Sequence, residues 1–420
     1  MTRLRLRRNP VLRVDVARPA SGGVHYPHIV APTSISRIRS LDGLRGVAAV
    51  GVLLGHARLV YMQNDPKPWV YMPGVRHLLD ALGAWGATAV WLFFVLSGFV
   101  LALSFRNSPR TDYGVYVLRR LARLYLPVWG AVLLALVSML FISRDVDGLG
   151  TWVGAHPPTP TPWGVIADLT LLSGTGSNVT PLWSLRWEIF FSLLLIAYIA
   201  AARSIRPGIL LAVCAMLSTV GGIYENALLL YMPMFGIGVG FAFAWPTIER
   251  WATALRERLS PLLGGALAVA ALVAVMGAQL APNLLPKLGV TSSIALPAMT
   301  TLTRLVSVSL IVVLVGTSVT IGRAFSSRMI LWLGMISFSL YLTHETVLLG
   351  FVYSTAANPV ALAGAVALCF PVAWLFYRAV EKPAHAFAKR IGARPADTTA
   401  PTYATAPGAG AESPPPGPKP

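Results

Sequence analysis

Charged residues are scarce in this chain. They make up 12% of its 420 residues, whereas hydrophobic residues make up 55%. Because soluble domains carry about 25% charged residues, this scarcity excludes an ordinary soluble protein, and the mean hydropathy of +0.65 agrees. Cysteine is scarcer still: Cys214 and Cys369 both lie in apolar runs, so no disulfide framework is expected.

The common signatures of soluble enzymes are also missing. The sequence contains no Walker-type phosphate loop, no Gly-x-Ser-x-Gly elbow and no His-Glu-x-x-His metal helix. None of the seven histidines has an aspartate four or five residues downstream, the spacing used by two common classes of acyltransferase. No metal site is therefore predicted.

What the chain has instead is a series of apolar segments that begins near residue 42. Each is close to the roughly 20 residues that a helix needs to span hydrocarbon. They lie near 42–62, 83–105, 124–143, 181–202, 208–224, 226–245, 261–281, 300–322, 329–353 and 359–380. The sequence thus predicts an all-α polytopic membrane protein of about ten transmembrane helices. A shorter apolar stretch at 163–173 predicts an interfacial or re-entrant helix.

Basic residues fall unevenly between the loops. One side of the membrane receives the N-terminal arginines, the 106–123 loop, Arg203, Arg206, Arg250, Arg256, Arg258, Arg323, Arg328 and the C-terminal cluster. The other side receives Arg58, Lys67, Arg76, Arg144 and Lys287. Since cytoplasmic loops carry the excess of Lys and Arg, both termini are predicted to be cytoplasmic in a multi-pass protein of the inner (plasma) membrane. This placement explains most of the net charge of +18 without a nucleic-acid partner.

Two tails flank the membrane region. Residues 1–37 are basic and contain no apolar core of signal-peptide length after the early arginines, so they predict a disordered cytoplasmic extension. Residues 386–420 are rich in Pro, Ala, Gly and Thr and cannot bury enough apolar surface to fold. The transmembrane domain is accordingly expected over residues 38–385.

Several polar side chains fall at membrane depth, where an ionisable group costs a few kcal/mol and is a functional candidate by default. His56 lies 11 residues after Arg45, roughly 16 Å along a helix, near mid-bilayer. Glu188 and the Ser97–Gly98 pair are expected at a similar depth, and His344 further out in the ninth span.

Each of these residues also has a structural interpretation. A membrane histidine is often only an interhelical hydrogen-bond donor worth about 1 kcal/mol, and a Ser-Gly pair is more often a close-packing notch than a nucleophile. Chemistry near neutral pH would need a base, for which an imidazole is the natural side chain. His56 is therefore the first catalytic candidate, and Ser97 is the weaker candidate for a covalent acyl-enzyme.

Six short blocks, in register over residues 38–383, give the chain a family resemblance. They are LDGLRG at 41–46 followed by His56, FFVLSGF at 93–99, RRLARLYLP at 119–127, LWSLRWE at 182–188, ISFSLYLTH at 336–344 and EKP at 381–383. Together they resemble the signatures of membrane acyltransferase family 3, the group of bacterial O-antigen and macrolide O-acyltransferases. One departure is Phe338, which stands where a tyrosine is usual, so a hydroxyl there is not essential.

The resemblance implies an enzyme that transfers an acyl group, acetyl or another short chain, from cytoplasmic acyl-coenzyme A to a hydroxyl. The acceptor would be a sugar, glycolipid, cell-wall glycan or natural product. Acyl-coenzyme A would be a co-substrate, and no bound cofactor is implied. High Ala, Arg and Pro usage hints at a GC-rich bacterium.

The residues fit roles in such a reaction. His56 is placed to take the proton of the acceptor hydroxyl, with Arg45 and Asp42 at the cytoplasmic mouth below it. Glu188 is expected to orient His56 or to bind the acceptor. The coenzyme is expected to contact a basic and small-residue set made of Arg119, Arg120, Arg123, Ser97 and Gly98. The alternative for the three arginines is that they only enforce the orientation of the protein in the membrane.

The acceptor path is expected to include Trp183, Trp187 and His344, with interfacial anchoring as the alternative role of the tryptophans. Two rival interpretations stay open at this point. A transporter or flippase would also have buried polar residues, but its usual repeated halves are not found here. A structural or sensory membrane protein would keep the fold without chemistry.

Overall fold

The computed structural model describes residues 38–64, 73–107, 112–146, 148–172, 174–175, 178–355 and 357–392. Every regular element in these residues is a helix, which confirms the all-α prediction. The predicted tail 1–37 lies outside the described residues, and so does most of the predicted tail 386–420. The last helix, α15 (Lys382–Arg390), runs past the predicted domain boundary at residue 385.

Nine helical segments of the described residues are long and apolar enough to cross a membrane. The helices that form them are α1 (Arg39–Asn64), α2 (Pro73–Asn107), α3 (Tyr113–Phe141), α6 (Leu185–Ser204), α8 (Ala227–Arg258), α9 (Pro261–Gly277), α11 (Ala295–Thr317), α13 (Arg328–Thr355) and α14 (Pro359–Phe376). A tenth helix, α7 (Pro207–Ile223), is apolar but has only 17 residues. Each of the ten predicted segments is therefore helical, and the polytopic architecture is confirmed.

Short elements connect these helices. They are α4 (Thr151–Gly154), α5 (Pro162–Thr170), η2 (Thr180–Ser184), η3 (Ala278–Leu280), α10 (Ala281–Leu284), η4 (Pro286–Leu288), α12 (Val319–Phe325) and the single π-helical stretch η5 (Tyr377–Glu381). Helix α5 corresponds to the short helix predicted at 163–173, and the side chain of Trp163 on it is 72% exposed.

Polar caps fix where several helices begin. The side chains of Asp112, Asn226, Ser260 and Asn358 accept hydrogen bonds from the first-turn N–H groups of α3, α8, α9 and α14. Such caps satisfy donors that have no partner inside the helix. In an apolar chain they are the local signals that separate one span from the next.

The tightest of these connections joins α7 to α8 through residues 224–226. Glu225 there has a φ of +52°, in the left-handed region that reverses a chain over very few residues. Asn226 follows at once as the N-cap of α8, with its Oδ1 3.0 Å from the N–H nitrogen of Leu229. The two helices therefore pack side by side as a hairpin.

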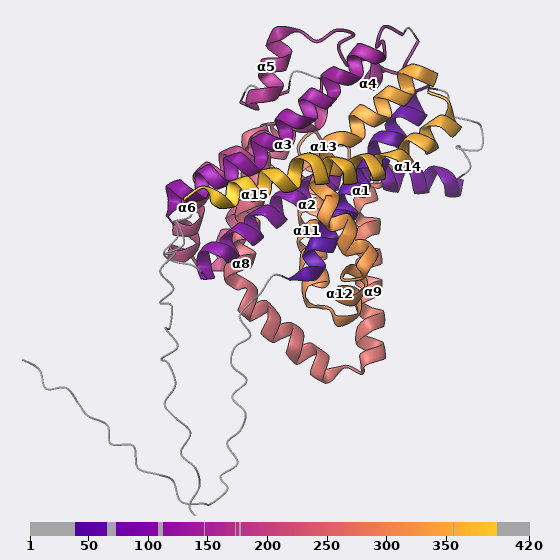
Figure 1. The fold of residues 1–420 in the computed structure, drawn as a ribbon. Helices are drawn as coiled ribbons and strands as arrows, with labels where there is room; N and C mark the ends of the chain where they lie inside the picture. Colours follow the sequence, from indigo (N-terminus) through magenta and orange to yellow (C-terminus); the bar gives the residue numbers. More distant parts are fainter. Residues whose placement is uncertain are drawn as a thin grey trace, which may run out of the picture. The chain divides into compact units, whose positions relative to one another are not determined.

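Helix α13 lies at the centre of the molecule. It packs against α1 and α14, α1 packs in turn against α2, and α2 packs against α8. Within the apolar window of α13, 72% of the residues are buried, against 6% for α9 at the periphery. Figure 1 shows α1, α2 and α13 in the middle, with α9 and α12 at one end and α4 and α5 at the other.

Glycines let two of these helices approach backbone to backbone. A Cβ placed on Gly98 of α2 would overlap the carbonyl oxygen of Phe235 in α8, and a Cβ on Gly238 would overlap that of Val95. Close approach through small residues is the usual packing device between membrane helices. Gly98 therefore has the close-packing role that was the structural interpretation of the Ser97–Gly98 pair.

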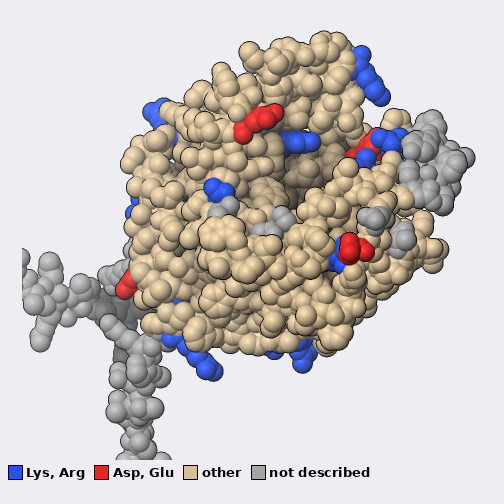
Figure 2. Space-filling model, turned by 90° about the horizontal axis from the view of Figure 1, so that it is seen from above, with Lys and Arg blue, Asp and Glu red and all other residues tan. Residues whose placement is uncertain are grey.

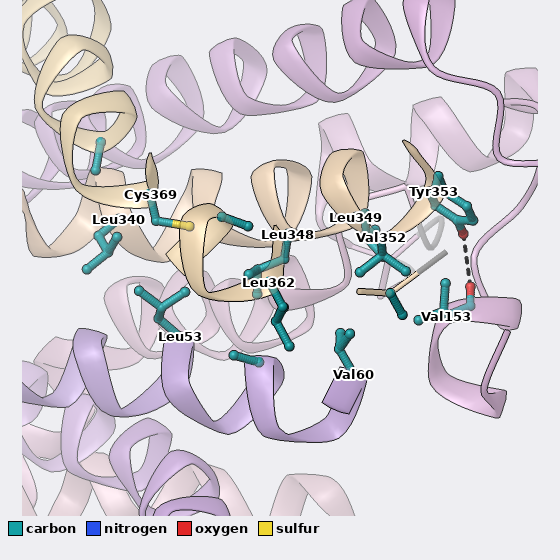
Figure 3. Packing of buried hydrophobic residues seen from close by; sticks show 14 of the residues in the cluster. Leu53, Val60, Val153, Leu340, Leu348, Leu349, Val352, Tyr353, Leu362 and Cys369 are labelled. Carbon is teal, nitrogen blue, oxygen red and sulfur yellow. Dashed lines mark hydrogen bonds between the residues drawn. The ribbon is translucent and has the colours of Figure 1, made fainter. Parts of the chain in front are cut away.

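The apolar core around α13 is continuous. Figure 3 shows Leu53 and Val60 of α1 facing Leu340, Leu348 and Val352 of α13, while Leu362 and Cys369 of α14 close the other side. This core holds α1 and α13 rigidly beside each other. Any polar side chain that faces across the α1–α13 contact is consequently fixed in place.

Candidate active site

One such polar contact joins His56 of α1 to His344 of α13. The Nδ1 atom of His56 lies 2.8 Å from Nε2 of His344, and the two rings are within 8° of coplanar. The His344 side chain is fully buried, whereas His56 is partly exposed. The prediction that His344 lies further out than His56 is wrong, because the crossing of the two helices brings them to the same depth.

The backbone determines which nitrogen of each ring carries hydrogen. Nδ1 of His344 lies 2.9 Å from the carbonyl oxygen of Leu340, which can only accept, so this nitrogen is the protonated one. The Nε2 of a neutral His344 is then an acceptor, and Nδ1 of His56 must donate to it. The Nε2 atom of His56 is left with its lone pair, as a base requires.

A loop segment covers the other side of His56. Trp152 of α4 stacks on the His56 ring, with centroids 5.1 Å apart and planes 23° apart. The segment is fastened to the end of α1 by Gln63, whose Oε1 accepts from the Trp152 N–H at 2.8 Å. It is fastened to α13 by Tyr353, whose hydroxyl donates to the Val153 carbonyl at 3.0 Å, the dashed line in Figure 3.

A second titratable pair lies directly behind this arrangement, and its histidine, His156, was not among the residues that the sequence indicated. Nε2 of His156 is 2.7 Å from Oε1 of Glu345, and both side chains are almost fully buried. Nδ1 of His156 faces the Trp152 carbonyl at 3.0 Å, and Thr180 donates to the same Glu345 oxygen at 2.5 Å. His156 sits in a loop among prolines with no periodic pattern, so no sequence signal points to it.

Ser97, Arg120 and Glu188 form the other polar cluster inside the helices. Oε2 of Glu188 accepts from Nη2 of Arg120 at 2.6 Å and from the Ser97 hydroxyl at 2.7 Å. Arg120 also donates to the Ser97 oxygen at 3.1 Å and to Ser192 at 3.3 Å. The partner of Glu188 is therefore Arg120 on α3.

Glu188 was expected to orient His56 or to bind the acceptor, and the first alternative is wrong. Its carboxylate is engaged with Arg120 and Ser97, and the imidazole is oriented by His344. The Ser97 hydroxyl donates a hydrogen bond to Glu188 and accepts one from Arg120. Ser97 is thereby held as part of an ion-pair network.

Arg45 is an exposed residue near the start of α1. Its side chain is exposed although its neighbours Leu44 and Gly46 on α1 are buried. Its charge interacts with those of Glu188 on α6, Arg120 on α3, Glu381 on η5 and Asp42 on its own helix. An exposed guanidinium among charges from four elements marks a space that water can enter.

Of the remaining basic candidates, Arg119 makes a structural contact and Arg123 is exposed. Nε of Arg119 donates to the Ile391 carbonyl at 2.8 Å and so ties α3 to the end of α15. Arg123 is exposed, and its charge interacts with Glu381 and His385. Glu381 in turn accepts from the N–H and hydroxyl of Ser339 at 3.1 and 2.5 Å.

Trp183 and Trp187 belong to an aromatic group between α2, α6 and α8. Tyr231 lies at its centre, with ring centroids 5.2 Å from Trp183 and 5.6 Å from Trp187. Phe94 completes it at 5.6 Å from Tyr231. Trp187 is buried and Trp183 is partly buried, so both face protein.

Among the described residues, no group of three His, Cys, Asp or Glu side chains is placed to hold a metal ion. The histidines that meet here bind one another and backbone carbonyls instead. The chemistry that the arrangement offers is proton transfer at His56, with the exposed Arg45 roughly 16 Å away along α1.

Comparison with known proteins shows which family this chain resembles in sequence. The chain matches the acyltransferase domain of acyltransferase family 3 over residues 38–378. It is similar to acyltransferase MdmB of Streptomyces mycarofaciens, with 29% identity over 163 residues that cover 39% of this chain and 39% of MdmB. It is also similar to protein 2 in the picA locus of Rhizobium radiobacter, with 29% identity over 195 residues that cover 43% of this chain and 92% of that protein.

No solved structure matches the chain. The alignment with MdmB spans about two fifths of that protein, whereas the domain match extends from the start of α1 to η5. It therefore includes both histidines and both polar clusters, and it favours acyl transfer over transport. This multi-pass protein belongs to the membrane acyltransferases of family 3.

Proposed function

We propose that the protein is an acyl-coenzyme A-dependent O-acyltransferase of the inner membrane in which His56 is the general base. The observation that carries the proposal is the hydrogen bond between His56 and His344, which leaves the lone pair of His56 Nε2 free. A base held in one tautomer at a fixed position is what activation of an alcohol requires.

The reaction proceeds by direct transfer. The acceptor hydroxyl gives its proton to Nε2 of His56 as its oxygen attacks the thioester carbonyl carbon. The carbon–sulfur bond then breaks, and the departing coenzyme thiolate takes the proton from the imidazolium. The products are an ester and free coenzyme A, and the imidazole returns to its starting state.

The donor reaches His56 from the arginine-lined space. Arg45 and Arg123 are exposed there, and guanidinium groups bind phosphates through paired N–H donors. Arg45 lies roughly 16 Å below His56 along α1, a distance that the extended pantetheine arm of the coenzyme covers. Arg120 is held in its ion pair with Glu188 and shapes the wall of this path.

The acyl group is acetyl or another short chain, and the acceptor is a hydroxyl of a sugar, glycolipid, cell-wall glycan or natural product. Trp183 and Trp187 line the acceptor side together with Tyr231. The Ser97 hydroxyl donates a hydrogen bond to Glu188 and accepts one from Arg120, which supports direct transfer over a seryl intermediate.

The test is replacement of the base. His56→Ala is expected to lower the rate of acyl transfer from radiolabelled acetyl-coenzyme A by a factor of about 10² to 10⁴, the usual contribution of a general base. His77→Ala is the matched control, because His77 is exposed on α2 away from the site. Transfer by the His56 variant at the rate of the control would reject the assignment.

A further inference from the structure

Two arginines have no role in the scheme above and lie at the same end of the bundle. Arg186 is the second residue of α6, and Arg304 is the tenth residue of α11. Both helices begin at the end that the arginine distribution assigns to the outside of the membrane. Arg304 is about 14 Å into its span, well inside hydrocarbon that is about 30 Å thick.

Both guanidinium groups lie over aromatic rings: Arg186 over Trp187 of the group around Tyr231, and Arg304 over Trp91, which is one turn before Phe94 on α2. The Cζ atom of Arg186 lies 5.0 Å from the Trp187 ring centroid, and that of Arg304 lies 5.7 Å from the Trp91 ring centroid. The charge of Arg304 also interacts with Tyr231, whose ring is 5.6 Å from that of Trp187. The two cations therefore border one aromatic platform.

Each of the two arginines keeps an unsatisfied nitrogen within the described part of the chain. The Nε atom of each is buried and has no hydrogen-bond partner there. None of the ion pairs formed among the described residues includes Arg186 or Arg304. An arginine at this depth normally pairs with a carboxylate or marks a binding path, because an unpaired charge costs several kcal/mol.

Stacking leaves the edge of a guanidinium free, and the edge carries the N–H donors. Two such edges around one platform suit a phosphate group, which presents several acceptor oxygens and binds arginine in a bidentate manner. The aromatic platform suits the first methylene groups or the sugar next to that phosphate. Figure 2, which looks down on the end of the molecule that carries α4 and α5, shows a hollow in the surface with basic and acidic side chains near it.

We infer that Arg186 and Arg304 bind the phosphate of a lipid-linked acceptor in the outer half of the membrane. The inference rests on the proposed function, because it names the class of its acceptor. The phosphate anchors the lipid at the aromatic platform beside Phe94, and the neighbouring Phe93 on the same helix packs toward Tyr341 and the His344 ring. A hydroxyl carried beside the phosphate is thereby directed toward His56.

Binding of short-chain lipids to purified protein in a neutral detergent tests this site. Dioctanoyl-phosphatidic acid is expected to bind, whereas dioctanoylglycerol, which lacks only the phosphate, is expected to bind at least about tenfold more weakly. Arg186→Gln and Arg304→Gln should each weaken phosphatidic acid binding about tenfold, as expected for loss of a charge-assisted contact. Lys287→Gln is the control, because Lys287 is an exposed cation at the same end.

Three outcomes would overturn the inference: equal binding of both lipids, equal binding by the arginine variants and the Lys287 variant, or displacement by inorganic phosphate at the concentration of the lipid. The last would mean that a free phosphate is the ligand. Arg304→Lys keeps the charge and guards against a folding defect, and it should bind with intermediate strength.

The His56→Ala variant separates this inference from the proposed function. It is expected to bind phosphatidic acid as the wild-type protein does, because His56 lies outside the aromatic platform. Arginine-dependent lipid binding together with unimpaired acyl transfer by His56→Ala would overturn the proposed base and keep the phosphate site. If His56→Ala loses acyl transfer and lipid binding does not depend on either arginine, the phosphate site is overturned and the proposed base is kept.

Discussion

At the scale of single residues, one backbone carbonyl decides which nitrogen of His56 would act as the proposed base. The Leu340 carbonyl fixes the hydrogen of His344, and His344 then fixes that of His56. The second imidazole fills the place that a carboxylate takes in many hydrolases, but without a negative charge. We therefore propose that His344 is a positioning residue, whereas the sequence predicted a place for it on the acceptor path.

His344→Phe is expected to lower kcat about tenfold or more with little change in KM for acetyl-coenzyme A. Phenylalanine fills the space but cannot accept from His56, so the tautomer and orientation of the base are lost. His344→Gln keeps an acceptor and should restore part of kcat. Steady-state kinetics of both variants in detergent provide the measurement, and equal kcat values for phenylalanine and glutamine would refute the positioning role.

Glu188 and Arg120 form an ion pair whose side chains are 11% and 16% exposed. Glu188→Gln leaves the Arg120 charge without its partner and is expected to destabilise the protein by about 3 kcal/mol. The double change Arg120→Met with Glu188→Leu removes both charges and should recover most of that loss. Thermal unfolding in detergent measures this, and additive effects of the two single changes would contradict a direct pair.

At the scale of helices, the length of the apolar segments and the polar capping residues between them account for most of the fold. All ten segments expected from apolar runs are helices, because each is long enough to satisfy its own backbone in lipid. The contact between His56 and His344 spans 288 residues of sequence and depends on how α1 crosses α13. No local pattern encodes that crossing, which is why the sequence indicated His56 as a candidate but not its partner.

The contact between α2 and α8 is also not encoded in a local sequence pattern, and it yields a prediction. Gly98→Ala is expected to destabilise the protein by about 1–3 kcal/mol, the usual cost of overpacking, because its Cβ would overlap the Phe235 carbonyl and push α8 away. Gly364 in α14 is the control: nothing lies within 4 Å of its Cβ position, and Gly364→Ala should be neutral or stabilising.

Melting temperatures of the two alanine variants in one detergent give the comparison. A Gly98→Ala protein as stable as Gly364→Ala would show that α2 and α8 are not in backbone contact. Activity is a second readout, because Ser97 is the neighbour of Gly98 and holds Glu188. A shift of α2 should therefore disturb the ion-pair network as well.

At the scale of the whole molecule, the proposed acyl-coenzyme A mechanism needs one orientation in the membrane. The open space around Arg45 and Arg123 must face the cytoplasm, where acyl-coenzyme A is made. Most of the basic loops lie at that end, and the positive-inside rule then sets the orientation. The aromatic platform with Arg186 and Arg304 would accordingly open to the opposite side.

Cysteine labelling in intact cells tests this orientation. Both native cysteines, Cys214 and Cys369, are buried, so the unmodified protein should not react with a membrane-impermeant maleimide and provides the background. Lys287→Cys places a thiol on exposed η4 and is expected to be labelled in intact cells. Arg206→Cys, in the exposed turn between α6 and α7, should be labelled only after permeabilisation. Labelling of Arg206→Cys in intact cells would place the arginine-lined space outside, where no acyl-coenzyme A can reach it, and would refute the donor path while leaving the His56–His344 geometry unchanged.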